Sequence, residues 1–233
     1  MGVLKAWLMA DLFRRRFLDL LCSIYIYNEH RGYTAIDRML KAIRSSWPDD
    51  YALIALVEKH RADEHKHYLM FRRWFERRGD MPFDLDRACG HIDRFVEIAF
   101  GSPIDDLDPL LIGRDDLFER LCRVVSLTEK RGYRQVEALL RNRTVLADSM
   151  LTKIFRVIEQ DEPSHWAPYD GWLIDHGRRP ANWRERAIDG FVHGELLALK
   201  LPVLFLSPAL SRRTTWPDAH DEAQGPEPAR AAA

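Results

Sequence analysis

Two short motifs in this chain place a glutamate and a histidine one helical turn apart. Each motif reads Asp-Glu-x-x-His: the residues are Asp63, Glu64 and His67 in the first copy and Asp161, Glu162 and His165 in the second. Side chains three residues apart project from the same face of a helix. Carboxylate and imidazole groups together are typical ligands of iron and manganese. The spacing therefore indicates a metal site.

Both motifs interrupt a seam of apolar or ring-bearing residues. The seam positions are Leu53, Val57, His60, Phe71 and Trp74 in the first copy and Leu151, Phe155, Ile158, Tyr169 and Trp172 in the second. Such residues at alternating spacings of three and four form the buried face of a helix. The glutamate and histidine of each motif are therefore expected to point into the core of a helical bundle.

A further glutamate occupies a seam position in each half of the chain. Glu29 lies in Glu-His-Arg-Gly-Tyr and Glu129 in Glu-Lys-Arg-Gly-Tyr. In antiparallel helical hairpins with a rise of about 1.5 Å per residue, each comes level with the motif glutamate of its own hairpin. Four bare carboxylates in an apolar seam would repel one another and be costly to bury. Two divalent cations remove this conflict, and the predicted ligands are Glu29, Glu64, His67, Glu129, Glu162 and His165.

The second half of the sequence repeats the first. Residues 29–33 match residues 129–133, and residues 63–82 match residues 161–180 in their motif, aromatic, glycine and proline positions. This self-similarity predicts a tandem duplication of a three-helix unit, with repeat units of about 4–102 and 103–205.

The predicted fold class is all-α, a four-helix bundle with two additional helices. In the first unit, helices are expected over about 4–44, from Asp50 to about residue 78, and over 92–100, with Gly or Pro at their ends. These helices form one domain of residues 1–205. The Pro-, Ala- and charge-rich residues 206–233 are expected to be a disordered tail.

The composition is that of an ordinary globular protein. Hydrophobic residues make up 46% and charged residues 30% of the 233 residues, and the net charge of −1 gives no indication of nucleic-acid binding. The three cysteines, Cys22, Cys89 and Cys122, form no Cys-x-x-Cys pair, so a reducing, cytoplasmic setting is expected. No segment has the roughly 18 apolar residues of a transmembrane helix.

Residues 15–177 resemble the ferritin-like superfamily of non-haem di-iron proteins. The resemblance rests on the six predicted ligands in their helix order. The doubled Asp-Glu-x-x-His motif looks more like the oxygenases and ribonucleotide reductase small subunits than the iron-storage ferritins. By this resemblance, Asp63 and Asp161 accept hydrogen bonds from the ligand histidines. Pro163, inside the second motif, departs from the family pattern and predicts a local kink.

The resemblance implies a di-iron oxidoreductase that activates O₂ to oxidise or hydroxylate a small organic substrate, as a monooxygenase does. The expected cofactor is two iron ions, with manganese or a mixed Mn/Fe pair as alternatives. A separate protein is expected to donate electrons, and the chain could form an oligomer. Two alternative functions stay open: peroxide reduction, as in rubrerythrin- or manganese-catalase-like proteins, and non-catalytic iron binding or storage.

Several residues near the predicted ligands could serve either the metal site or the packing of the helices. Tyr33 and Tyr133 either assist the metals or are core aromatics, and Gly32 and Gly132 permit either close helix packing or open volume. Arg31 and Arg131 are expected to form ion pairs. Glu159 is a candidate seventh carboxylate, whereas His30, His60 and His65 are expected to pack or to lie on the surface.

Overall fold

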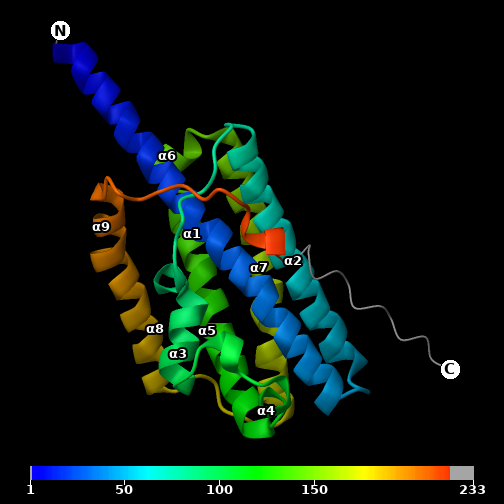
Figure 1. Cartoon of the computed structure of the whole chain (residues 1–233). Helices are drawn as coiled ribbons and strands as arrows, with labels where there is room; N and C mark the ends of the chain where they lie inside the picture. Colours follow the sequence, from blue (N-terminus) through cyan, green and yellow to red (C-terminus); the bar gives the residue numbers. More distant parts are fainter. Residues whose placement is uncertain (1, 221–233) are drawn as a thin grey trace.

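Four long helices form the centre of the computed structural model, which describes residues 2–220 (Figure 1). They are α1 (Gly2–Ser46), α2 (Tyr51–Glu76), α5 (Asp115–Leu139) and α7 (Ser149–Asp175). Helix α1 packs along α2, α5 packs along α7, and α2 contacts α7 between the two hairpins. No strand is present in the described part of the chain, so the all-α prediction is confirmed there.

The helix ends lie where the local sequence places them. The Asp50 side chain accepts a hydrogen bond from the backbone of Leu53 and caps α2, and Asp148 caps α7 in the same way. Gly79 and Gly177 follow these two helices with φ angles of 66° and 62°, a conformation that favours glycine. Helix α7 continues through Pro163 and Pro168 as one element.

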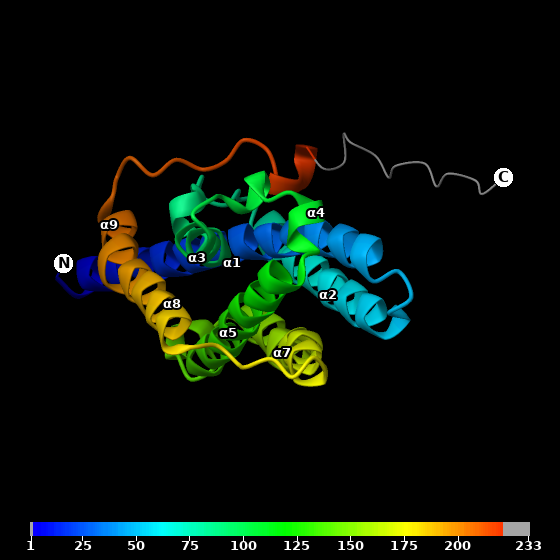
Figure 2. The same ribbon diagram turned by 90° about the horizontal axis from the view of Figure 1, so that it is seen from below.

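Two shorter helices, α3 (His91–Phe100) and α8 (Trp183–Glu195), lie beside α1 and α5 (Figure 2). Helix α3 contacts both α1 and α5, and α8 contacts α3 and α5. A π-helical turn, Leu196–Lys200, joins α8 to α9 (Leu201–Leu206). The remaining described turns of helix are α4 (Pro109–Ile112), α6 (Arg143–Leu146) and 3-10 turns at Arg87–Cys89, Ile104–Asp106 and Pro217–His220.

Two apolar clusters fill the interior at different levels of the four long helices. One includes Ile26, Phe71 and Phe155, and the other includes Ile43 and Phe118, all at most 1% exposed. The candidate ligands lie along the helices between these clusters. The buried polar groups are therefore surrounded by hydrocarbon above and below. No helix of the described residues is both long and apolar enough for a membrane crossing.

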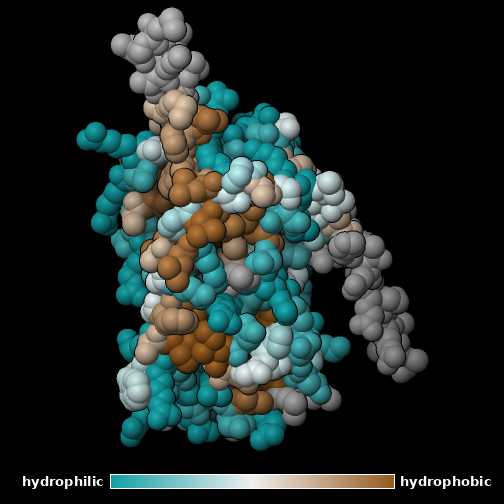
Figure 3. All heavy atoms as spheres, turned by 60° about the vertical axis from the view of Figure 1, so that its left-hand side comes forward, coloured by the Kyte–Doolittle hydropathy of each residue, from teal (hydrophilic) through white to brown (hydrophobic). Residues whose placement is uncertain are grey.

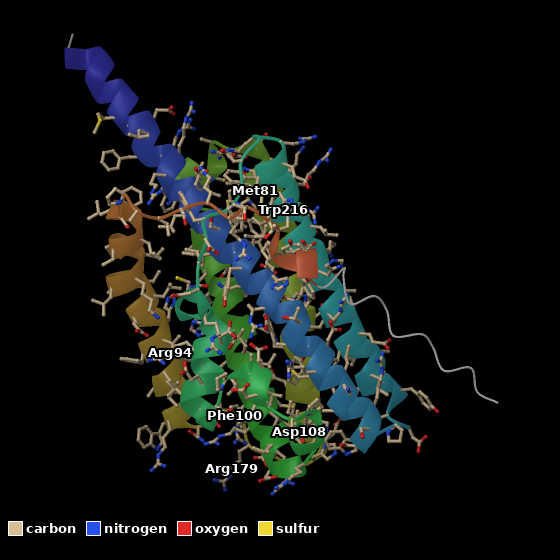
Figure 4. The ribbon with its side chains drawn as sticks, in the orientation of Figure 1. Met81, Arg94, Phe100, Asp108, Arg179 and Trp216 are labelled. Atoms are coloured by element: carbon tan, nitrogen blue, oxygen red, sulfur yellow. The ribbon has the colours of Figure 1, made fainter. Side chains whose placement is uncertain are left out.

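The prediction of a tail from residue 206 is wrong for residues 207–220, which run across the molecule as a C-terminal strap. Arg212 pairs with Asp19 at 2.6 Å and donates to the backbone oxygen of Met81. Figure 4 labels Met81 and, on the strap, Trp216. Asp218 accepts hydrogen bonds from Tyr68 at 2.7 Å and from Arg72 at 2.8 Å. Composition alone misses these long-range ion pairs. The rest of the predicted tail, residues 221–233, lies outside the described residues.

Candidate metal centre

Two groups of buried ligand atoms meet in the middle of the four long helices. The first group is Glu29, Glu64 and His67, and the second is His60, Glu64, Glu129 and His165. Within each group, one ligand atom per residue lies within 4.8 Å of all the others. Glu64 belongs to both groups, so its carboxylate lies where it could bridge two ions.

Both motif histidines turn their Nδ1 atoms toward carboxylates. The Nδ1 of His67 lies 3.4 Å from Oε2 of Glu29, and the Nδ1 of His165 lies 3.2 Å from Oε1 of Glu64. The side chains of both histidines are at most 1% exposed. Each imidazole therefore presents one nitrogen to the centre of the site.

The other ring nitrogen of each histidine faces an aspartate from the opposite hairpin. His67 Nε2 lies 2.9 Å from Asp161 Oδ2, a hydrogen bond, and His165 Nε2 lies 3.6 Å from Asp63 Oδ2. Lys66 contacts both aspartates, at 2.7 Å and 2.6 Å. An aspartate at Nε2 holds the proton on that atom and leaves Nδ1 free to bind a metal ion.

Glu162 lies at the edge of the second group. Its Oε2 is 3.7 Å from Nδ1 of His165, and the residue is 7% exposed. It is absent from both close ligand groups among the described residues, although it faces the same centre.

Several buried polar atoms of the site have no hydrogen-bond partner among the described residues. They are Nδ1 of His67, Nδ1 and Nε2 of His165, Nε2 of His60 and Oε2 of Glu162. A buried, unpaired polar atom costs about 1–3 kcal/mol. Most of these atoms are lone-pair donors at the centre of the site, so the arrangement fits a bound metal ion.

Burial and mutual repulsion change the acidity of the carboxyl groups. Burial and the charge of Glu64 raise the pKa of Glu29 to about 7 and that of Glu129 to about 8. Burial and the charge of Glu129 also raise the pKa of Glu162. Burial opposes ionisation of Glu64 as well, but the adjacent imidazoles of His165 and His60 outweigh it and lower the pKa of Glu64. Glu64 is thus the most readily ionised of the four carboxyl groups.

The pKa values of the two motif histidines are raised, whereas burial lowers the pKa of most imidazoles. Burial lowers the pKa of each ring, but the adjacent carboxylates of Asp161 and Glu29 raise that of His67 to about 10. The adjacent carboxylates of Asp63 and Glu64 raise that of His165 to about 10 in the same way. Without metal, the site therefore holds extra protons that a cation would displace.

A cavity of about 670 Å³ lies between α1 and α5, on the side covered by α3 and α8. The four glutamates Glu29, Glu64, Glu129 and Glu162 line it together with His60. Its apolar walls include Leu21, Ile24, Ile36, Met39, Ile92, Ile104, Leu121, Val125 and Leu196. Exposed lining residues such as Ala138 and Leu197 mark an opening between α5 and the π-helical turn. A small molecule in this cavity would lie directly against the candidate ligands.

Apolar side chains also gather on the outer face formed by α9 and the N-terminal part of α1 (Figure 3). The exposed residues there include Leu12, Phe13, Val203 and Leu206. Phe13 stacks on Phe205 with ring centroids 5.7 Å apart, so the two elements share one apolar surface.

The structure places Tyr33 and Tyr133 away from the cavity, among whose lining residues neither is found. The ring of Tyr33 contacts His30, His65 and Tyr68. Tyr133 contacts Trp166 with ring centroids 5.7 Å apart. These contacts favour the reading as packed aromatic residues. Tyr25 lines the cavity instead, and burial raises its pKa.

Both glycines next to the ligand glutamates allow a close approach. A Cβ atom at Gly32 would lie 2.4 Å from Oε2 of Glu64, and one at Gly132 would lie 3.3 Å from Oε1 of Glu162. Both glycines also line the cavity. The two readings of these positions therefore apply together, since the missing side chains leave room for a carboxylate and for the cavity.

Three neighbouring charged residues belong to neither ligand group. Arg31 pairs with Asp93 at 2.6 Å, and Arg131 pairs with Asp189 at 3.1 Å, so both arginines join the long helices to α3 and α8 as ion pairs. Glu159 pairs with Arg156 at 2.8 Å on the surface and does not join either ligand group.

His60 differs from its sequence-based reading, because the structure brings this histidine into the second ligand group. The signal was its position in the same seam as Glu64 and His67, about one turn before Glu64 in the helix.

No protein-family model, curated protein or solved structure matches this chain.

Proposed function

We propose that this chain is a ferritin-like di-metal carboxylate enzyme that uses O₂ to oxidise or hydroxylate a small, largely apolar organic substrate. The proposed cofactor is two iron ions, with manganese or a mixed Mn/Fe pair as alternatives. The two hairpins and the helix that follows each of them would be the two copies of a duplicated three-helix unit. Three buried free cysteines agree with a reducing, cytoplasmic setting.

The arrangement of donors supports two ions. Glu29 and His67 lie on one side of Glu64, and Glu129 and His165 lie on the other. One glutamate from each of two helices, with Glu-x-x-His from each of the other two, is the donor set of di-iron carboxylate bundles. Glu162 would complete this set beside His165.

The protein's own groups would prepare the site for that chemistry. The aspartates at Nε2 orient the imidazoles, and the apolar clusters above and below keep bulk water away from the carboxylates. When bound, the iron pair would supply the redox chemistry with O₂, using electrons from a separate donor.

The cavity is the observation that favours an organic substrate over the alternative functions. Its volume of about 670 Å³ lies within the usual range for small-molecule sites, roughly 300–1,000 Å³, and its walls are mostly apolar. The candidate ligands form part of its surface, so a substrate would lie next to the ions. Iron storage requires no such substrate cavity, and peroxide needs far less room.

The test begins with metal analysis of the purified protein and anaerobic loading with Fe(II). We expect two ions per chain and rapid O₂ consumption when the reduced protein meets air. Mass spectrometry after exposure to ¹⁸O₂, with decanol as an apolar probe, should detect ¹⁸O in the alcohol or in the side chains that line the cavity.

Other outcomes separate the alternatives. Rapid decay of H₂O₂ without ¹⁸O transfer would favour peroxide reduction, and uptake of many iron ions per chain would favour storage. Failure to bind iron or manganese would contradict the di-metal proposal itself.

A further inference from the structure

One pair of buried residues makes the two halves of the site unequal. His60 and Tyr169 lie on different hairpins, and the Nδ1 of His60 is 2.9 Å from the Tyr169 hydroxyl oxygen, a hydrogen bond. Counting 98 residues along the repeat, His60 corresponds to Ile158 and Tyr169 corresponds to Phe71. The second pair is hydrocarbon, and both of its members belong to one apolar cluster. The chain thus has a polar pair in one half-site where it has an apolar pair in the other.

Core packing alone does not account for the polar pair. His60 is 1% exposed and Tyr169 is fully buried, so both lose their hydration. Their hydrogen bond satisfies Nδ1 of His60 and the tyrosine hydroxyl, but Nε2 has no hydrogen-bond partner among the described residues. Isoleucine and phenylalanine, which serve at the matching positions, would avoid this unpaired atom.

The unpaired nitrogen faces the candidate metal site. His60 Nε2 lies 3.5 Å from Oε1 of Glu64 and 3.8 Å from Oε1 of Glu129. The imidazole ring also stacks on that of His165 with centroids 4.3 Å apart. These are the other three members of the second ligand group.

We propose that His60 is a third nitrogen ligand, which binds the ion of the second group through Nε2, and that Tyr169 positions its ring. When Nε2 binds a metal, Nδ1 carries the proton, and this N–H donates a hydrogen bond to the tyrosine oxygen. The second group then has two imidazoles, His60 and His165, against one in the first. This inference rests on the proposed di-metal site and concerns the difference between its two halves.

Because the two ligand groups offer different donor atoms, they should bind the same metal ion with different affinities. Imidazole donors favour later divalent metals such as Co²⁺, whereas carboxylates also suit harder ions such as Mn²⁺. The two-imidazole group should therefore take up Co²⁺ first and more tightly. The carboxylate-rich group should fill second, so a titration should show two separate binding events.

The experiment is an anaerobic Co²⁺ titration of the full chain, followed by calorimetry and by NMR of the loaded protein. The wild type should show two binding events and three exchangeable, paramagnetically shifted imidazole N–H signals. His60→Ile, which copies the matching repeat position, should lose one such signal and weaken the tighter event by at least about 10-fold. Tyr169→Phe should keep three imidazole ligands but weaken the same event by about 10-fold.

Two control variants test whether the effects are specific to His60 and Tyr169. His65→Phe changes a histidine next to Glu64 whose ring contacts Tyr33 and Tyr68, and it should leave both events unchanged. The double variant His60→Ile with Tyr169→Phe restores the apolar pair of the other half-site. It should therefore fold, as circular dichroism would show, and still bind two ions.

The outcomes separate this inference from the proposed function. Two ions bound with unchanged affinities in His60→Ile, with only two shifted N–H signals in the wild type, would overturn the role of His60 alone. No binding of Co²⁺, iron or manganese by the wild type would overturn the di-metal site and this inference with it.

Discussion

Gly32 on α1 lies so close to Glu64 on α2 that a Cβ atom at position 32 would sit 2.4 Å from Oε2 of Glu64. This glycine leaves room for the carboxylate that both ligand groups share. The matching contact at Gly132 is looser, at 3.3 Å from Oε1 of Glu162. The pair therefore allows a test of how exactly the shared carboxylate must be placed.

Gly32→Ala should weaken metal binding much more than Gly132→Ala. Alanine is the better helix former, so Gly132→Ala should raise the stability of the metal-free protein by up to about 1 kcal/mol, whereas in Gly32→Ala the displacement of Glu64 opposes this gain. In Gly32→Ala the new methyl group displaces the Glu64 carboxylate, so we expect at least a tenfold loss of Fe(II) or Mn(II) affinity by calorimetry. Equal affinities in the two variants would contradict this account.

Replacing the aspartates by asparagine should affect the two histidines unequally. Asp161 faces His67 at 2.9 Å, whereas Asp63 faces His165 at 3.6 Å. Asp161→Asn should therefore reduce metal affinity within the range of about 10- to 100-fold, and Asp63→Asn should have the smaller effect. Competition with a chelator measures both, and an unchanged affinity in Asp161→Asn would exclude its role in holding His67.

Glutamine substitutions should distinguish the charged glutamate from its protonated neighbour. The adjacent imidazoles of His165 and His60 outweigh burial and lower the pKa of Glu64, whereas burial and Glu129 raise that of Glu162. Glu64→Gln removes the partner of a buried imidazolium and should cost the metal-free protein about 3 kcal/mol. Glu162→Gln replaces a neutral group by a neutral one and should leave that stability nearly unchanged. Denaturant unfolding in EDTA measures both, and equal losses would show that the two carboxyl groups share one charge state.

The stability of the metal-free protein should fall as the pH rises from about 5 to about 10. Folding raises the pKa of Glu29 from 4.5 to about 7, and it raises those of His67 and His165 from 6.5 to about 10. The stability that these groups contribute is fully present below the unfolded values and is lost as the pH passes the folded values. Melting temperatures in EDTA measure the trend, with metal-loaded protein as the control. Metal affinity should rise with pH, because cations displace the same protons. A metal-free melting temperature that stays flat or rises between pH 6 and 9 would contradict these assignments.

Closing the cavity should block an apolar ligand without affecting the metals. Ala138 is exposed and lines the opening, so tryptophan at this position should reduce binding of the neutral dye N-phenyl-1-naphthylamine by at least tenfold. Ala55→Trp, at an exposed position on α2, is the matched control. Unchanged fluorescence titration of Ala138→Trp would place the dye, and by inference the substrate route, elsewhere.

The sequence predicts those features that depend on local spacing. Asp50 and Gly79 set the ends of α2, and the seam positions bring Glu64 and His67 into the buried layer. These features follow from helical periodicity and capping, which act within a few residues. Glu29 and Glu64 lie at the same height in the hairpin because they are separated from its turn by similar numbers of residues.

The features that the sequence misses depend on contacts between distant segments. His60 looked like a packing residue because Tyr169, its partner across the hairpins, lies 109 positions away. The composition of the C-terminal strap predicts disorder, because the contacts of Asp218 with Tyr68 and Arg72 exist only in the folded protein. Periodicity gives the face of a helix, but it does not give the residue that this face meets.

The contact of Lys66 with Asp161 joins α2 to α7, as do the two aspartate–histidine pairs. Each hairpin can form from local contacts, but the complete ligand set exists only after the hairpins have docked. Contacts between residues about a hundred positions apart form late in folding. A metal ion captured at that stage stabilises the native state more than the transition state, and so it slows unfolding while leaving the folding rate nearly unchanged. Metal loading should therefore lengthen the lifetime of the folded chain, because it slows the separation of the two hairpins.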